Sequence, residues 1–361
     1  MEFKKTTLKD IAQKAGVSLS TVHKALYDKP GISERVKNEI VGIATSMGYK
    51  TNYVASSLKR KPIRIAVVIP LPDLGPNRYF YQDIWKGLRQ FKPQAAEFNV
   101  EFLEFGFSGS IEQLPKKLEE IYRSCADDIA GLITVATESP AVSYFIDRLI
   151  QKNTAVVLLC SDLPQSERLC CVRAQDAMAG GLAAELLHRF TAGQGKIAVA
   201  AGDPLNPSHY LNVDGFQTYL SKYAPQMEVI RIYNDNAPQQ LYQEVRQLLE
   251  QDEEITGLYS CNARNTLPLC RAARDTPSNR KPHIIGSDLF RENEEFLLQN
   301  TLQAIIYKNP IKMAFLACQT IFNYLVKNEF PRKENVYVFP TIVLKSNLSH
   351  YTNELSFLQN E

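Results

Sequence analysis

The sequence has no apolar segment long enough to cross a membrane. No run of about 18 uncharged apolar residues occurs in it. The first residues, MEFKKTTLKDIAQKAG, lack the apolar core of a secretory signal peptide. These two absences predict a cytoplasmic protein without a membrane partner.

Signatures of catalysis and of metal binding are also missing. The seven cysteines form no C-x-x-C pair and lie mostly in apolar runs, which predicts buried, reduced thiols. The five histidines are scattered, and there is no G-x-x-x-x-G-K-[ST], no G-x-S-x-G and no H-E-x-x-H. No G-x-G-x-x-G follows the first predicted strand. We therefore expect no enzyme activity, no cofactor and no metal.

What is present is an uneven distribution of charge. Residues 1–62 hold 12 Lys and Arg against 5 Asp and Glu, whereas the remaining residues hold 29 against 34. A basic head on a slightly acidic body predicts that a polyanion binds at the head. The chain has 361 residues, 45% of them hydrophobic, which suits two or three domains with cores of their own.

The head is predicted to form three short helices. Thr7 can cap the first helix, with Asp10 at the spacing of a capping box, and Gly16 ends that helix. Ser18 caps a second helix and Ser33 starts a third. Two helices joined by a turn of about three residues have helix-turn-helix geometry. The same pattern also suits a small helical bundle that binds protein.

From residue 63 onward the chain alternates between apolar segments and amphipathic ones. Nine segments are typical of buried strands: IRIAVVIP, VEFLEFGF, GLITVAT, AVVLLC, KIAVAAGD, MEVIRIY, GLYSCN, HIIGSD and LQAIIY. Helical stretches between them include 81–98, 111–125, 176–190, 209–223 and 238–251. The alternation predicts parallel sheets covered on both faces. Nine strands exceed one comfortable sheet, so we expect two subdomains that bind a ligand beyond the strands' carboxyl ends.

Both parts resemble the LacI/GalR family of bacterial transcription regulators. The head matches the family pattern densely over TLKDIAQKAGVSLSTVHKAL and ISERVKNEIVGIATSMGYKTNYVASSLKR. The body matches more loosely over nearly all of residues 63–345, with YFYQDIWKGL, VDGFQTYL and IIGSDLF among its anchors. The resemblance implies a small all-α helix-turn-helix head plus an α/β body. That body would contain two doubly wound parallel-sheet subdomains of periplasmic-binding-protein type.

The resemblance also implies boundaries and an assembly. We expect a helix-turn-helix domain over 1–48, a hinge helix or linker over 49–62, an N-terminal effector subdomain over 63–163 and 308–333, and a C-terminal effector subdomain over 164–307 and 334–361. A homodimer is expected, because two heads read two half-sites. The heptad-like spacing of Leu348, Tyr351, Leu355 and Leu358 covers too few repeats to predict a tetramer.

Residues that match the family's DNA contacts lie in the head and the hinge. Phosphate contacts are implied for Thr7, Ser18, Thr21 and Asn52, and base contacts for Leu19, Ser20 and Lys24. The family usually has Ser where His23 stands, and His23 would either donate to a phosphate or cover the edge of the bundle. In the hinge the implied contacts are Tyr53, Val54, Ala55 and Leu58, of which Leu58 matches a side chain wedged between base pairs in the minor groove.

The implied effector contacts lie between the two subdomains. By position, Asp176, Asn212, Asn262 and Asp288 match residues that hydrogen-bond a ligand, Tyr79 and Phe80 could stack on a sugar ring, and Lys308 lies at a crossing between subdomains. Asp176 could instead cap its helix, Asp288 could hold the crossover turn, and the two aromatic residues could belong to the core.

Departures from the family affect the predicted ligand. Many members carry Arg where Asn212 stands, Asp where Ala263 stands and Gln where Lys308 stands. We therefore expect a sugar or sugar derivative as effector, in a form that can bear an acid or a phosphate. The predicted function is that of a ligand-responsive transcriptional repressor that binds double-stranded operator DNA. A solute-binding protein or a sugar-processing enzyme with a basic helical head is the alternative.

Overall fold

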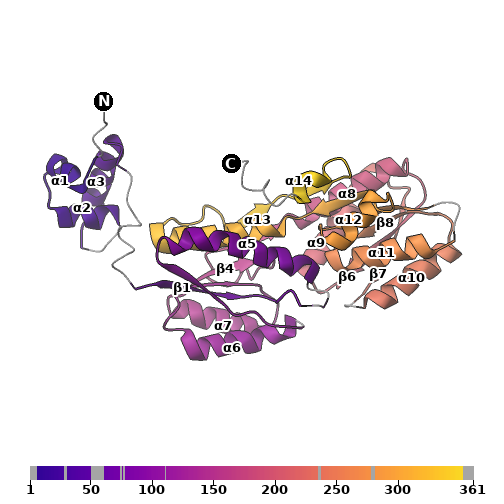
Figure 1. Ribbon diagram of the computed structural model, residues 1–361, viewed down its shortest axis with the longest axis horizontal. Coiled ribbons are helices and arrows are strands. Elements are labelled where there is room, and N and C mark those ends of the chain that lie inside the picture. Colours follow the sequence, from indigo (N-terminus) through magenta and orange to yellow (C-terminus); the bar gives the residue numbers. More distant parts are fainter. Residues whose placement is uncertain are drawn as a thin grey trace.

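The computed structural model describes residues 6–27, 31–49, 61–73, 75, 78–109, 111–234, 237–277 and 281–352. Within this part of the chain a head of three helices precedes a body of alternating strands and helices (Figure 1). The head helices are α1 (Leu8–Ala15), α2 (Leu19–Leu26) and α3 (Glu34–Ser46). Their apolar faces meet in a small core formed by Ile11, Ala12, Val22, Ala25, Ile40 and Ala44. The predicted three-helix head is confirmed.

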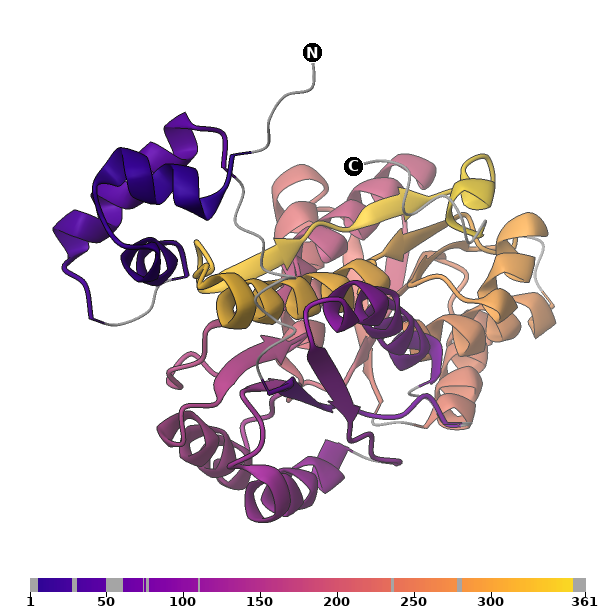
Figure 2. The same cartoon turned by 60° about the vertical axis from the view of Figure 1, so that its left-hand side comes forward.

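The first sheet of the body has the strand order β11-β5-β4-β3-β1-β2 among the described residues, and all its pairs are parallel. Its strands are β1 (Ile63–Val68), β2 (Val100–Glu104), β3 (Gly131–Thr134), β4 (Ala155–Leu159), β5 (Cys170–Ala174) and β11 (Asn335–Val338). Helices α5 (Arg78–Ala96) and α13 (Pro310–Lys327) cover one face, and α6 (Leu114–Cys125) and α7 (Pro140–Gln151) cover the other (Figures 1 and 2).

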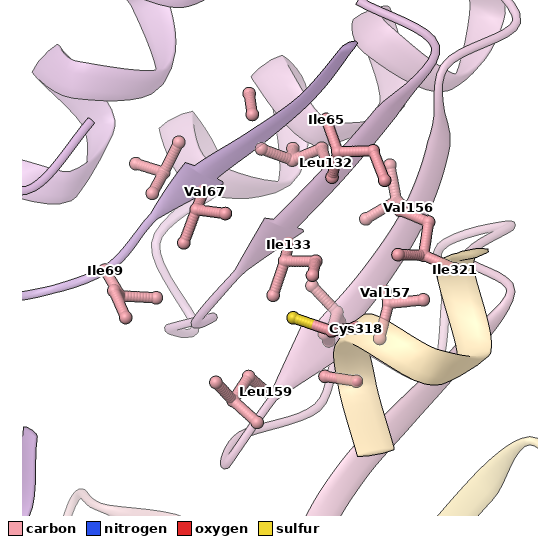
Figure 3. Packing of buried hydrophobic residues seen from close by; sticks show 14 of the residues in the cluster. Ile65, Val67, Ile69, Leu132, Ile133, Val156, Val157, Leu159, Cys318 and Ile321 are labelled. Atoms are coloured by element: carbon pink, nitrogen blue, oxygen red, sulfur yellow. The ribbon is translucent and has the colours of Figure 1, made fainter. Parts of the chain in front are cut away.

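The core of this subdomain explains why its strands are continuously apolar. Ile65, Val67 and Ile133 are at most 1% exposed, because helices lie on both faces of the sheet. Cys318 and Ile321 of α13 pack down onto the central strands (Figure 3). All seven cysteines of the chain are free thiols, five of them buried and two half-buried, as predicted for reduced thiols.

The second sheet has the order β12-β10-β9-β8-β6-β7 among the described residues, with only β12 antiparallel. Its strands are β6 (Lys196–Gly202), β7 (Glu228–Tyr233), β8 (Ile255–Ser260), β9 (His283–Ser287), β10 (Ala304–Tyr307) and β12 (Thr341–Val343). Helices α8 (Asp176–Phe190) and α9 (Pro207–Tyr223) pack on one face. Helices α10 (Pro238–Gln251), α11 (Ala263–Asp275) and α12 (Arg291–Leu298) pack on the other. A last helix, α14 (Leu348–Thr352), adds Leu348 to that core.

All nine predicted strands are present, but two of the expected subdomain boundaries are wrong. We expected residues 164–307 and 334–361 in the second subdomain, whereas β5 and β11 pair within the first sheet. The chain therefore passes between sheets after residues 174, 307 and 338. The reason is that strand pairing is decided between distant segments, and neither CCVRA nor NVYV contains a local signal for the sheet that it joins.

Candidate functional site

The turn between α1 and α2 is built by local hydrogen bonds. Thr7 and Asp10 form the predicted capping box at the start of α1. Gly16 ends that helix at φ 65°, a left-handed conformation that costs glycine little. Ser18 caps α2 by accepting a hydrogen bond from the Thr21 backbone N–H at 3.1 Å. These caps place the amino-terminal end of α2 directly after a three-residue turn.

The first residues of α2 project into solvent. Ser18, Leu19 and Ser20 are exposed, and Leu19 is 44% exposed although it is apolar. Thr21 in the same turn and Lys24 in the next are half-buried. His23 is half-buried as well, and its ring stacks on Tyr27 with 4.4 Å between centroids. That contact corresponds to the bundle-edge role considered for His23. The predicted hinge contacts Asn52, Tyr53, Val54, Ala55 and Leu58 lie outside the described residues.

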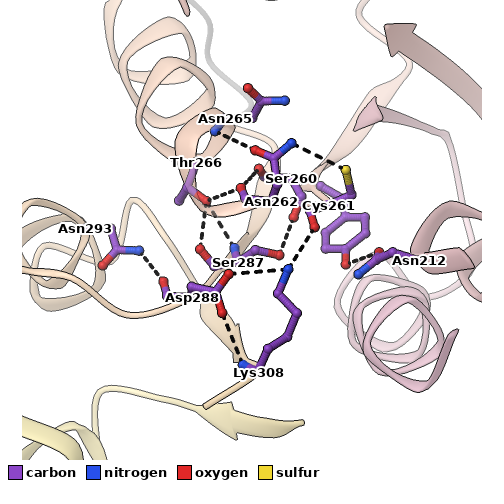
Figure 4. A network of polar contacts seen from close by, with 11 residues as sticks. Asn212, Ser260, Cys261, Asn262, Asn265, Thr266, Ser287, Asp288, Asn293 and Lys308 are labelled. Carbon is purple, nitrogen blue, oxygen red and sulfur yellow. Dashed lines mark hydrogen bonds and ion pairs between the residues drawn. The ribbon is translucent and has the colours of Figure 1, made fainter. Parts of the chain in front are cut away.

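In the body, five predicted effector contacts form one buried group, which we call the polar cluster. Its members are Asp176, Asn212, Asn262, Asp288 and Lys308, each at most 6% exposed. They lie at the start of α8, within α9 and at the carboxyl ends of β8, β9 and β10. This is the edge at which doubly wound sheets bind ligands. Figure 4 shows Asn212, Asn262, Asp288 and Lys308 converging from these elements.

Asp176 is the member of the polar cluster whose side chain makes the fewest hydrogen bonds. It is 2% exposed, and neither of its carboxylate oxygens has a hydrogen-bond partner among the described residues. The nearest ion pair is to Arg173, at 3.6 Å. Burial raises the pKa of Asp176, and the charges of Lys308 and Arg173 oppose this rise, as does the nearby Ser208 hydroxyl, which does not reach hydrogen-bond geometry. The residue that precedes α8 as its cap is Gln175, so Asp176 does not have the capping role considered for it.

Asn212 is fully buried, and only one of its two side-chain polar atoms has a hydrogen-bond partner among the described residues. Its Oδ1 accepts a hydrogen bond from the Tyr259 hydroxyl at 2.6 Å, whereas its Nδ2 has no partner among the described residues. Asn212 lies where α8 and α9 touch through their backbones. A Cβ on Gly180 would be 1.8 Å from the Asn212 carbonyl oxygen, and one on Gly215 would be 2.0 Å from that of Ala177. These two glycines let Asn212 approach the beginning of α8.

Asn262 and its neighbours fix the ends of β8 and β9. Asn262 Oδ1 caps α11 by accepting from the Asn265 N–H at 3.1 Å, and its Nδ2 has the Cys261 sulfur at 3.8 Å. The Ser260 hydroxyl donates to the Asn262 carbonyl, and the Ser287 hydroxyl donates to the Ser260 carbonyl (Figure 4). Asn262 therefore has a structural role that the sequence interpretation did not assign to it.

Asp288 and Lys308 form a buried ion pair at the second crossing between sheets. Asp288 has φ 57°, and its Oδ1 accepts from the Lys308 backbone N–H at 3.2 Å, which is the turn-holding role considered for it. Lys308 Nζ lies 3.4 Å from Asp288 Oδ2 and 3.4 Å from the Cys261 carbonyl oxygen. Burial acts to lower the pKa of Lys308, but Asp288 and Asp176 outweigh it and the pKa is raised. The ammonium is therefore charged at neutral pH.

The two aromatic residues predicted to stack on a sugar lie between the subdomains. Tyr79 packs against Phe290 of the second subdomain, with 4.4 Å between ring centroids. Beside it, Arg78 Nη2 pairs with Glu292 Oε1 at 2.7 Å. Phe80 packs against the core of the first subdomain, and Lys308 Nζ lies 5.9 Å from its ring centroid. Tyr79 thus joins the subdomains, and Phe80 is the one that borders the polar cluster.

Sequence reasoning missed two residues beside this cluster. His209 is 8% exposed, and its Nδ1 accepts from the Asp203 N–H at 3.1 Å. Burial lowers the pKa of His209 to about 3, and the charges of Lys308 and Arg264 add to the effect, so the ring is neutral. Burial likewise raises the pKa of the Cys160 thiol, with Asp176 adding to the rise. Cys160 directly follows the buried strand β4, which is the signal that could have identified it, whereas His209 lies in the first turn of α9, several residues after β6 ends.

Asp83 on α5 is expected to make the stability of the protein depend on pH. Burial raises its pKa to about 7, Lys86 opposes the rise and Asp288 adds to it. The pKa of an aspartate in the unfolded chain is about 3.9. Because the pKa of Asp83 is higher in the folded protein, its contribution to the free energy of unfolding falls as pH rises from the unfolded pKa to the folded pKa. We expect Asp83→Asn to raise the melting temperature more at pH 8 than at pH 4.5. Asp147→Asn, at an exposed position on α7, is the control, and equal gains at both pH values would contradict the prediction.

The described residues contain no group of three or more His, Cys, Asp and Glu side chains arranged to hold a metal ion. Over the same part of the chain, no helix combines the length and apolar character needed to cross a membrane.

Comparison with known protein families matches both parts of the chain. The model of the periplasmic binding protein domain matches residues 71–329, and the model of bacterial regulatory proteins of the lacI family matches residues 7–52. The glucose-galactose binding protein GanP from Geobacillus stearothermophilus has a similar structure, with a TM-score of 0.69 and 20% identity. The similarity covers 80% of this chain and 99% of GanP, and it concerns the fold.

Two regulators are similar in sequence. The ribose operon repressor of Bacillus subtilis is 28% identical over 158 residues, which are 42% of this chain and 46% of that protein. Catabolite control protein A of Priestia megaterium is 23% identical over 288 residues, which are 78% of this chain and 82% of that protein. The chain thus matches about half of the first relative and most of the second.

Proposed function

Because the chain belongs to the lacI family of bacterial regulatory proteins, we propose that it is a repressor whose head binds operator DNA under the control of a small effector. The effector is a sugar or sugar derivative that binds at the polar cluster. The observation that carries this proposal is the unsatisfied, buried carboxylate of Asp176 in a chain that also has a helix-turn-helix head. A buried carboxylate without hydrogen bonds is costly unless a ligand supplies them.

The exposed end of α2 suits the major groove of DNA. Ser18, Ser20 and the helix amino terminus can donate to phosphates and hold the protein in register. Leu19 can contact a thymine methyl group, and Lys24 can donate to guanine O6 or N7. A homodimer would present two such helices to the two halves of a palindromic operator.

The effector would act by changing how the two subdomains meet. The polar cluster belongs to the second subdomain, whereas Phe80 and the Arg78–Glu292 ion pair bring α5 of the first subdomain against it. A ligand that bridges them changes the relative population of two arrangements, and only one of these suits operator binding. The linkage is reciprocal, so operator DNA must change the affinity for the effector by the same factor. A sugar effector is consistent with the similarity to the ribose operon repressor of Bacillus subtilis.

Selection of bound DNA from a random pool tests the proposal. The full chain is expected to enrich a palindrome, and its affinity should fall steeply between about 50 and 200 mM salt. Lys24→Ala should cost about 1–3 kcal/mol and relax base preference at one position of each half-site. Lys14→Ala, on the exposed side of α1, should keep the base preference. Failure to enrich any sequence, with and without a panel of sugars, would refute the proposal.

A further inference from the structure

Lys308 is a buried ammonium group whose capacity for hydrogen bonds is only partly used. Its side chain is 8% exposed, and its contacts to Asp288 Oδ2 and the Cys261 carbonyl are both 3.4 Å long. Charge-assisted N–H···O bonds usually measure about 2.7–2.9 Å, and an ammonium carries three N–H donors. Lys308 therefore retains the capacity for a shorter bond to an added acceptor.

The turn at Asp288 does not depend on the positive charge of Lys308. Asp288 Oδ1 binds the backbone N–H of Lys308, and the backbone N–H of Asp288 donates to the Ile306 carbonyl at 2.9 Å. Asn293 Nδ2 donates to the Asp288 carbonyl at 2.7 Å. None of these bonds uses the Lys308 side chain. Burial of a charge costs several kcal/mol, and at this place the ammonium compensates the buried carboxylates of Asp288 and Asp176 rather than holding the turn.

Cations outnumber carboxylates around this point. Arg173 and Lys308 act on Asp176, and Arg264 and Lys308 both act on His209 and on Cys261. Against these three cations stand the buried carboxylates Asp176 and Asp288, while Asp83 near Asp288 is opposed by a cation of its own, Lys86. The site can therefore accept one negative charge without leaving an excess of anions.

Unsatisfied side-chain atoms of Asp176 and Asn212 indicate the other groups of the ligand. The two oxygens of Asp176 accept hydrogen bonds and call for hydroxyl donors, whereas Asn212 Nδ2 donates and calls for a ligand oxygen. A polyhydroxylated molecule supplies both kinds of group. Phosphate carries a charge of about −1.5 to −2 at pH 7, which exceeds the single excess cation. A carboxylate carries one negative charge and matches it.

We propose that the effector is an acidic sugar, a uronate or aldonate, whose carboxylate binds Lys308 Nζ while its hydroxyls donate to Asp176. This inference rests on the proposed function, because it names the chemical class of the same effector. A neutral amide at this position would not compensate an anion, whereas the Lys308 ammonium does. The hydroxyl contacts alone would not separate an acidic sugar from its neutral parent.

Calorimetric titration of the full chain tests this inference with matched pairs of ligands. The probes are glucuronate against glucose, galacturonate against galactose and gluconate against glucose, with glucose 6-phosphate as the phosphate arm. At least one acid is expected to bind ten-fold or more tightly than its neutral partner and than the phosphate. Lys308→Gln should reduce that ratio to near one, and Lys308→Arg should keep part of it. Lys312→Gln, exposed on the adjacent helix α13, should leave the ratio unchanged.

Operator binding measured in parallel separates the two levels of the proposal. If neutral sugars bind as tightly as the acids and alter operator binding, the acid inference is wrong and the repressor proposal stands. The same holds if Lys308→Gln folds and keeps the full preference for acid, or if the phosphate binds best. If no acid binds, the inference is wrong as well. If the chain without substitutions shows no sequence-specific DNA binding, the repressor proposal itself is refuted.

Discussion

Asp176→Asn is expected to make the ligand-free protein more stable while it weakens effector binding. The substitution keeps the shape of the side chain but removes a buried charge that has no hydrogen bond among the described residues. An unsatisfied buried polar group costs about 1–3 kcal/mol, and more when it is charged. Hydrogen bonds to a charged group contribute about 1.5–3 kcal/mol each, so effector affinity should fall on the order of 100-fold, which titration calorimetry measures.

The opposite signs of the two effects make this test selective. Substitution of a residue with a purely structural role would lower the stability of the protein. Substitution of a ligand-binding residue that lacks hydrogen bonds in the ligand-free protein would raise it. Asp214→Asn provides the control, because Asp214 lies on α9 in an exposed position and should change neither quantity. A melting temperature that falls in Asp176→Asn, together with unchanged effector affinity, would show that Asp176 is structural.

Gly180→Ala is expected to reduce the free energy of unfolding by about 3 kcal/mol or more, because overpacking a close contact has a large cost. The added Cβ would lie 1.8 Å from the Asn212 carbonyl oxygen and 2.8 Å from the Phe216 nitrogen. Both are backbone atoms, so α8 and α9 must separate to make room. That separation moves Asn212 away from the start of α8, and effector affinity should fall with stability. Chemical denaturation and calorimetry measure the two effects.

The neighbouring glycine is a matched control. A Cβ on Gly181 would meet nothing closer than the Gly215 carbonyl oxygen at 3.9 Å. Gly181→Ala should therefore be neutral or slightly stabilising, because alanine has a higher helix propensity by about 1 kcal/mol. Equal effects of the two substitutions would mean that the contact between α8 and α9 is not what positions Asn212.

The local features of this protein follow from its sequence, because each depends on residues a few positions apart. Thr7 with Asp10, and Ser18 with Thr21, cap their helices through bonds that span three residues. The alternation of strands and helices in the body likewise follows from hydrophobic period and length. The resemblance in the head is dense because these local signals are closely spaced. The three helices of the head and nine strands of the body could therefore be predicted from the sequence.

The tertiary structure alone decided which strands share a sheet and which polar groups lack partners. Nothing near β5 or β11 in the chain indicates their neighbours, because strand pairing joins distant segments. For the same reason the sequence could not distinguish Asn262, which caps α11, from Asp176, whose oxygens have no hydrogen bonds among the described residues. Burial and hydrogen bonding depend on all neighbours in space. The sequence determined the kind of protein, and packing decided which residues remain for a ligand.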